Sequence, residues 1–109
     1  MHREHQVRQG LLAIEALLKT HALWQNEAPE SAAFDSTQPF FLDTMRPLQW
    51  LQWVLIPRMH ALLDAGAALP QNFAIAPYYE MALDAGTPGR HELLAHLSAL
   101  DALFTTTDR

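Results

Sequence analysis

Two histidines near the C-terminus, His91 and His96, enclose the sequence HELLAH, which is similar to the helical motif of zinc proteases. The histidines of that motif stand four residues apart, so that both face one metal ion. His91 and His96 are five residues apart, and this spacing separates them by about 140° around a helix. We therefore expect two surface histidines and no metal site here.

Two other pairs have the i, i+4 spacing that brings side chains together on a helix. His60 and Asp64 could form a general base in which the carboxylate orients the imidazole, or a surface ion pair with no catalytic role. Glu80 and Asp84 carry like charges, which is typical of a solvated helix face. Hydrolase or transferase chemistry that uses His60 with Asp64 or Glu80 is one hypothesis for this chain.

Other catalytic arrangements are missing from the sequence. The chain has no cysteine, so disulfides and thiolate metal sites are excluded. Its four glycines are scattered and form no phosphate-binding loop. None of its serines follows the strand and turn that would make it a nucleophile. We expect no catalytic residue, no metal and no cofactor, and hence a protein that is not an enzyme.

Large aromatic side chains are the more promising candidates for a binding surface. Trp50, Trp53, Tyr78 and Tyr79 are of the types enriched at protein interfaces. With His60 they form our candidate partner or ligand surface. The alternative is that the two tryptophans pack beneath the chain's own loop or a neighbouring helix, because monomers rarely leave so large an apolar patch open.

Four segments carry apolar residues with helical periodicity: residues 4–24, 47–63, 77–85 and 88–104. They predict an all-α, four-helix, bundle-like single domain over residues 1–109. The expected core positions are Val7, Leu11, Ile14, Leu18 and Ala22 in the first helix, Leu48, Leu51, Leu55, Ile56, Met59, Leu62 and Leu63 in the central helix, and Leu93, Leu97, Leu100 and Phe104 in the last.

The central helix contains a proline at each end of its first half. Pro47 suits the first turn, and Asp43 or Thr44 could cap the free N–H groups there. Pro57 removes a backbone hydrogen bond inside the helix, but the apolar pattern resumes in phase at Met59. We therefore expect one helix with a proline kink.

The connections are marked by polar residues, glycine and proline. Residues 25–37 predict a long irregular loop between the first two helices, which Phe34, Phe40 and Phe41 would anchor. Residues 64–72 form the next connection, with Gly66 as helix stop. Gly86 should follow the third helix, Thr87 should cap the last helix and Pro88 should open it, with TTTDR fraying at its end.

The charge balance restricts the partners. Seven Lys and Arg against twelve Asp and Glu give a net charge of −5, which disfavours direct binding to nucleic acid. The N-terminal MHREHQVRQ does not resemble a secretory signal, and no apolar run approaches the ~20 residues of a membrane span. We expect a soluble, cytoplasmic protein with no membrane contact.

Two stretches, FDSTQPFFLDTMRPLQWLQWVLIPRMHALLD at residues 34–64 and FAIAPYYEMAL at residues 73–83, closely resemble the YqcC-like family of small bacterial proteins. The resemblance covers nearly the whole chain and implies an all-α four-helix fold. It implies no catalytic or binding residue. Family members tend to be encoded beside a tRNA pseudouridine synthase, so the resemblance also implies an accessory role in tRNA modification.

Two hypotheses of different kinds therefore lead. The first is a non-enzymatic interaction protein that self-associates or serves as an adaptor to a partner such as a tRNA pseudouridine synthase. The second is a small-ligand-binding protein with a pocket between the bent central helix and the Pro77 helix. Its lining would be Trp53, His60, Tyr78 and Tyr79.

Overall fold

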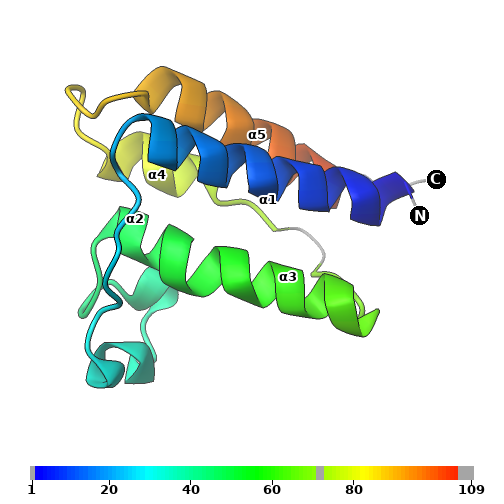
Figure 1. Ribbon diagram of the computed structural model, residues 1–109, viewed down its shortest axis with the longest axis horizontal. Helices are drawn as coiled ribbons and strands as arrows, with labels where there is room; N and C mark the ends of the chain where they lie inside the picture. Colours follow the sequence, from blue (N-terminus) through cyan, green and yellow to red (C-terminus); the bar gives the residue numbers. More distant parts are fainter. Residues whose placement is uncertain (1, 71–72, 106–109) are drawn as a thin grey trace.

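The computed structural model describes residues 2–70 and 73–105, and the regular elements in this part of the chain are all helical (Figure 1). The α-helices are α1 (His2–Thr20), α2 (Pro47–Trp50), α3 (Ile56–Ala65), α4 (Ala76–Ala82) and α5 (Arg90–Thr105). A π-helical segment, Leu51–Leu55, joins α2 to α3 without a break, and two short 3-10 turns lie at Ser31–Asp35 and Pro39–Phe41. With α2, the π segment and α3 counted as one central helix, the predicted all-α four-helix fold is confirmed.

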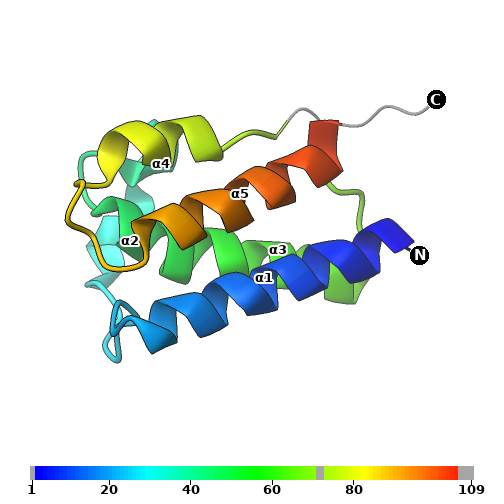
Figure 2. The ribbon, with the colours of Figure 1, turned by 90° about the horizontal axis from the view of Figure 1, so that it is seen from above.

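The helices α1 and α5 run antiparallel beside each other, and the central helix lies lengthwise beneath them (Figures 1 and 2). The start of α1 and the end of α5 meet at one end of the molecule, where Arg3 Nε donates a hydrogen bond of 2.8 Å to the carbonyl of Leu103. The short α4 packs on α5 at the other end. None of the described helices has the length and apolarity needed to cross a membrane.

One hydrophobic core lies between these helices. Its buried side chains are Val7, Leu11, Ile14 and Leu18 from α1, Leu51, Leu55, Ile56 and Met59 from the central helix, Leu93, Leu97, Leu100 and Phe104 from α5, and Ile75, Ala76, Tyr79 and Leu83 around α4. The predicted core stripes of α1 and α5 are therefore correct, except for Ala22. The helix α1 ends at Thr20, and Ala22 is exposed with a φ of 60° in the turn that follows.

The central helix is continuous, as predicted. Just before Pro57 it widens into a π-helical turn. The N–H of Ile56 bonds to the carbonyl of Leu51, five residues earlier. Widening the helix here accommodates the proline, which lacks an N–H and would crowd the preceding turn of an α-helix. Pro57 consequently lies in the first turn of α3.

The predicted cap of the central helix is wrong. Its N-cap is Arg46, whose backbone N–H donates to Oε1 of Gln49 at 2.8 Å. Asp43 and Thr44 lie too early in the chain and serve the loop instead. Thr44 Oγ1 donates to the carbonyl of Ala33 at 2.7 Å, and the Asp43 carboxylate accepts a hydrogen bond from a serine hydroxyl in the same loop.

The long loop before α2 covers the back of the central helix. Ala33, Phe41 and Met45 from the loop pack with Val54 in a second, smaller apolar cluster. Of the three predicted anchors, Phe41 is buried and Phe40 is half-buried, but Phe34 is 37% exposed and does not hold the loop. Phe34 lies on the outer side of a 3-10 turn whose inward position is taken by Ala33.

A buried carboxylate positions the start of α4. Asp101 of α5 is 8% exposed and accepts hydrogen bonds of 2.8–3.0 Å from the N–H groups of Ile75 and Ala76. Helix α4 ends at Ala82, earlier than predicted. Helix α5 begins at Arg90 instead of Pro88, because Thr87 to Arg90 form a turn closed by a hydrogen bond of 3.1 Å.

The predictions for the connection after the central helix and for the C-terminal end can be checked in part. Gly66 ends α3 in the left-handed conformation, with a φ of 66°, as expected of a helix stop. The last two residues of the connection predicted for residues 64–72 lie outside the described residues, as do residues 106–109, which contain most of the end predicted to fray.

Candidate functional site

The structure divides the five predicted binding residues into two groups. Trp50 and Tyr78 meet Phe40 between the central helix and α4, and Tyr79 meets Tyr78. Trp53 and His60 instead line a hollow on the side of the central helix that faces the loop after α1. The pocket predicted between the central helix and the Pro77 helix is therefore wrong in its composition, because the hollow with Trp53 and His60 contains neither tyrosine.

The first group is built largely into the fold. The rings of Phe40 and Tyr78 stack with centroids 3.9 Å apart, and the rings of Phe40 and Trp50 meet edge to face with centroids 4.9 Å apart. Tyr79 is completely buried, and its hydroxyl donates to the carbonyl of Pro47 at 2.7 Å. Burial raises the pKa of Tyr79 far above its ordinary value. Tyr79 is thus a core residue, while Tyr78 and Trp50 remain partly accessible.

The second group forms what we call the Trp53 hollow, with a volume of about 390 Å³. Its lining comprises Glu15, Trp24, Gln25, Asn26, Gln52, Trp53, Ile56, Pro57 and His60. Trp24 was missed by the sequence analysis because it was assigned to the end of the first helix. In the structure the chain has already left α1, and the half-buried Trp24 becomes a wall of the hollow.

A pair of amide groups holds the loop against the central helix beside this hollow. The backbone N–H of Gln25 donates to Oε1 of Gln52 at 2.8 Å, and Nε2 of Gln52 donates to the carbonyl of Gln25 at 2.7 Å. Trp53 Nε1 donates to Oε1 of Gln25 at 3.2 Å. The two tryptophan walls are therefore connected through one fixed loop residue.

Arg8 of α1 determines which ring nitrogen of His60 carries the proton. Its guanidinium lies 3.1 Å from Nδ1 of His60 and donates a hydrogen bond of 2.8 Å to Asp64. Since a guanidinium can only donate, Nδ1 accepts and the ring proton lies on Nε2. The predicted His60–Asp64 pair is replaced by this bridge through Arg8, so the carboxylate does not orient the imidazole as a general base would require.

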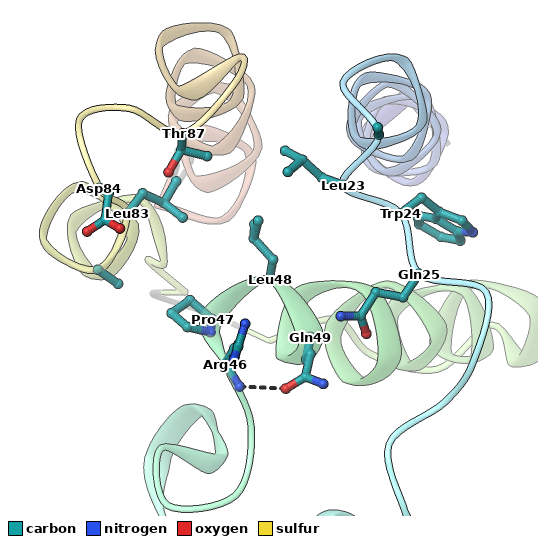
Figure 3. Close-up of a pocket in the computed structure, with 12 residues that line it drawn as sticks. Leu23, Trp24, Gln25, Arg46, Pro47, Leu48, Gln49, Leu83, Asp84 and Thr87 are labelled. Carbon is teal, nitrogen blue, oxygen red and sulfur yellow. Dashed lines mark hydrogen bonds between the residues drawn. The ribbon is translucent and has the colours of Figure 1, made fainter.

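A further hollow of about 370 Å³ lies at the start of the central helix, and we call it the α2 hollow (Figure 3). Leu48 points from α2 into the space between Leu23 and Leu83, which gives the hollow an apolar interior. Arg46 and Asp84 stand at its edge. Within the described chain neither of these two charged groups has a hydrogen-bond or ion-pair partner for its side chain.

The remaining candidates stay separate. His91 and His96 are both exposed on α5, as are Glu80 and Asp84 at α4 and just after it. In residues 2–70 and 73–105, no group of three His, Cys, Asp or Glu is placed to hold a metal ion. A third and more open hollow, of about 520 Å³, is lined by loop residues 25–29 and Gln49. The Trp53 hollow and the α2 hollow are the two that combine apolar walls with charged or hydrogen-bonding side chains.

Comparison with known proteins identifies relatives along nearly the whole chain. A family model described as "DUF446: tRNA pseudouridine synthase C" matches residues 6–103. A protein of Escherichia coli K12 named "Uncharacterized protein YqcC" is 61% identical over 98 residues, which cover 90% of each chain. An uncharacterized protein of Haemophilus influenzae is 41% identical over 104 residues, or 95% of this chain and 97% of its own.

One relative is much longer than this chain. A protein of Pectobacterium carotovorum named "tRNA pseudouridine synthase C" is 58% identical over 73 residues. The match covers 67% of this chain but 19% of the Pectobacterium protein. A segment similar to this chain is thus a minor part of that longer protein.

A solved structure has the same fold. The solution NMR structure of protein YqcC from E. coli superposes with a TM-score of 0.85 at 54% sequence identity. The alignment covers 100% of this chain and 96% of the other. The helical arrangement described above is therefore shared between the two proteins.

Proposed function

Because the chain belongs to the YqcC-like family, we propose that it is a non-enzymatic accessory protein that binds a tRNA pseudouridine synthase in the cytoplasm. One observation carries the proposal: the Pectobacterium protein named tRNA pseudouridine synthase C contains a segment 58% identical to 73 residues of this chain. The same words describe the family model.

The presence of a similar segment within one longer chain supports a binding function. Two domains in one chain experience an effective concentration in the millimolar range, so a weak contact between them is populated. Where the two are separate proteins, the same contact has to be made by association. A small chain without catalytic groups then acts through the surface that it offers to the enzyme.

The charge of the chain fits this division of roles. An enzyme that binds tRNA needs a basic surface to neutralise phosphates. This chain has a net charge of −5, and its composition lacks the excess of basic residues that accompanies direct RNA binding. Contact with tRNA therefore belongs to the partner, and the acidic chain is suited to bind a basic protein.

The direct test uses two purified proteins, this chain and the tRNA pseudouridine synthase C of the same organism. Size-exclusion chromatography with light scattering should show a complex whose mass equals the sum of its parts, and it should dissociate as salt rises. The chain alone, run at the same concentration, tests for self-association. Absence of a complex at tens of micromolar of each protein, at low salt, would refute the proposal.

A second candidate function rests on the α2 hollow. The guanidinium of Arg46, which has no hydrogen-bond or ion-pair partner in the described chain, adjoins an interior formed by Leu23, Leu48 and Leu83. Such a hollow suits a small molecule with an anionic group and an apolar part. Saturation-transfer NMR with a panel of fatty acids and apolar amino acids tests this function, and Arg46→Gln should abolish any signal that arises in the hollow.

A further inference from the structure

The Trp53 hollow has the composition of a protein docking site. Trp24 and Trp53 reach it from different elements, both are partly accessible, and Pro57 beside them is exposed. Tryptophans are the side chains that most often dominate binding energy at protein interfaces. Because Gln25 is fixed to Gln52 and Trp53, the walls are already positioned before anything binds, and a partner would pay little ordering entropy.

The hollow also contains a directed hydrogen-bond donor. Nδ1 of His60 is engaged by Arg8, so Nε2 carries the proton. Nε2 has no hydrogen-bond partner among residues 2–70 and 73–105, and the ring lines the hollow. An occupant therefore needs an apolar group for the tryptophans together with an acceptor, such as a backbone carbonyl, for His60.

The chain next to the hollow determines which kind of partner fits. Residues 25–45 contain Glu27, Glu30, Asp35 and Asp43 but no lysine or arginine. All four carboxylates are exposed. Figure 1 shows this segment on the side of α2 turned away from α1 and α5, so it is free to face another protein. We call it the acidic lobe. Its charge is complementary to a basic surface and repels both RNA and a second copy of itself.

We propose that the Trp53 hollow and the acidic lobe together form the docking surface for the synthase. An apolar side chain from a basic segment of the enzyme enters between Trp24 and Trp53, and its backbone carbonyl accepts from His60. The acidic lobe meets the basic residues that flank this segment. This inference rests on the proposed function and adds the position and chemistry of the contact.

Tryptophan NMR signals provide a specific test, because the chain has three tryptophans. Titration of the 15N-labelled chain with unlabelled synthase should shift or broaden the indole N–H signals of Trp24 and Trp53. The Trp50 signal should shift less than the other two, because that ring does not line the hollow and packs against both core clusters. Titration with tRNA alone should leave all three signals unchanged.

Variants test the energetic contribution. Trp53→Ala should weaken binding about tenfold or more, as expected for an interface hot spot. Glu27→Lys with Glu30→Lys should weaken it and also reduce its salt dependence. These two exposed glutamates lie outside the core, so this variant remains informative if Trp53→Ala does not fold. His96→Ala, on the exposed face of α5, is the control and should bind as the wild type does.

The outcomes separate the two proposals. If the wild-type chain binds the synthase but the Trp53 and glutamate variants bind equally well, the docking site is wrong and the accessory function stands. Loss of binding in Met81→Ser, which alters a side chain 90% exposed on α4, would place the contact elsewhere and equally overturn the site. If the wild type does not bind at all, both proposals fail. Indole shifts produced by tRNA alone would identify RNA as the occupant and overturn docking by a protein.

Discussion

The side chain of Gln52 and the peptide group of Gln25 form a two-membered hydrogen-bonded pair, 2.8 Å from N–H to side-chain oxygen and 2.7 Å from side-chain nitrogen to carbonyl. Gln52 is 3% exposed, although it lies in an otherwise apolar part of the central helix. Its amide pairs with both the N–H and the carbonyl of Gln25, a loop residue that belongs to no helix. Both hollows include Gln25 in their lining, so this pair shapes the candidate binding surface as well as the fold.

Gln52→Leu keeps much of the side-chain volume and removes both hydrogen bonds. It leaves the N–H and carbonyl of Gln25 unpaired, and we expect the free energy of unfolding to fall by about 2 kcal/mol. Urea denaturation followed by circular dichroism measures this change. Gln9→Leu, at an exposed position of α1, is the matched control and should leave stability nearly unchanged. Equal stability of the two variants would contradict the role given to Gln52.

Asp101→Ala removes the acceptor for two backbone N–H groups at the start of α4. Hydrogen bonds to a charged group contribute more than neutral ones, and we expect a loss of about 3 kcal/mol. Asp101→Asn retains one oxygen and should lose less. Asp84→Ala removes an exposed carboxylate and serves as the control. Hydrogen exchange should show that the amides of Ile75 and Ala76 lose their protection first.

Gly89→Ala should destabilise the fold for two reasons. Gly89 has a φ of +69°, and a Cβ there would lie 2.6 Å from Nε2 and 2.9 Å from Cγ of His21. We expect a loss of about 1–3 kcal/mol from the strained backbone and the contact combined. Gly86→Ala, three residues earlier in open space, should be nearly neutral.

A double variant separates the two causes at Gly89. His21→Ala with Gly89→Ala relieves the contact with the ring but keeps the unfavourable φ. It should therefore be more stable than the sum of the two single changes predicts. Strict additivity of the urea-derived free energies would mean that the ring makes no contribution.

Ionisation of Tyr79 should lower the stability of the fold at alkaline pH. Burial raises its pKa above the ordinary value of 10.0, with Tyr78 nearby adding to the effect. The native state consequently holds the phenolic proton more tightly than the unfolded chain does. Stability from this group is complete below about pH 10 and falls above it, by up to about 1.4 kcal/mol per pH unit.

Tyr79→Phe isolates this effect. It loses the hydrogen bond to Pro47 and should be about 1 kcal/mol less stable than the wild type at about pH 8. At about pH 11 the difference should shrink or reverse, since phenylalanine does not ionise. Urea denaturation of both proteins at the two pH values provides the measurement. A constant difference would show that Tyr79 titrates alike in the folded and unfolded states.

Periodicity was sufficient to predict the parts of the fold that depend on burial. Leu11, Ile14 and Leu18 face the core because residues three and four apart share one side of a helix. The same rule found Leu97 and Leu100 in α5. These features need no knowledge of what packs against them.

Polar residues that pair across the fold could not be found in this way. Asp101 and Gln52 interrupt apolar stripes, and their partners lie 25 to 27 residues away in the chain. Their burial becomes intelligible only once α4 and the loop are in place. The candidate site was predicted in part for the same reason: Trp53 and His60 lie on one helix, but Trp24 joins them only because α1 ends at Thr20.

The proximity of the start of α1 to the end of α5 has a consequence for how this domain can be joined to another protein. The start of α1 and the end of α5 lie together, whereas the α2 hollow lies beside the opposite ends of these helices (Figure 2). A tether attached through either helix would thus leave the same face of the bundle. The order of domains in a longer polypeptide would then matter little, and a linker from that face would leave the far end of the molecule accessible.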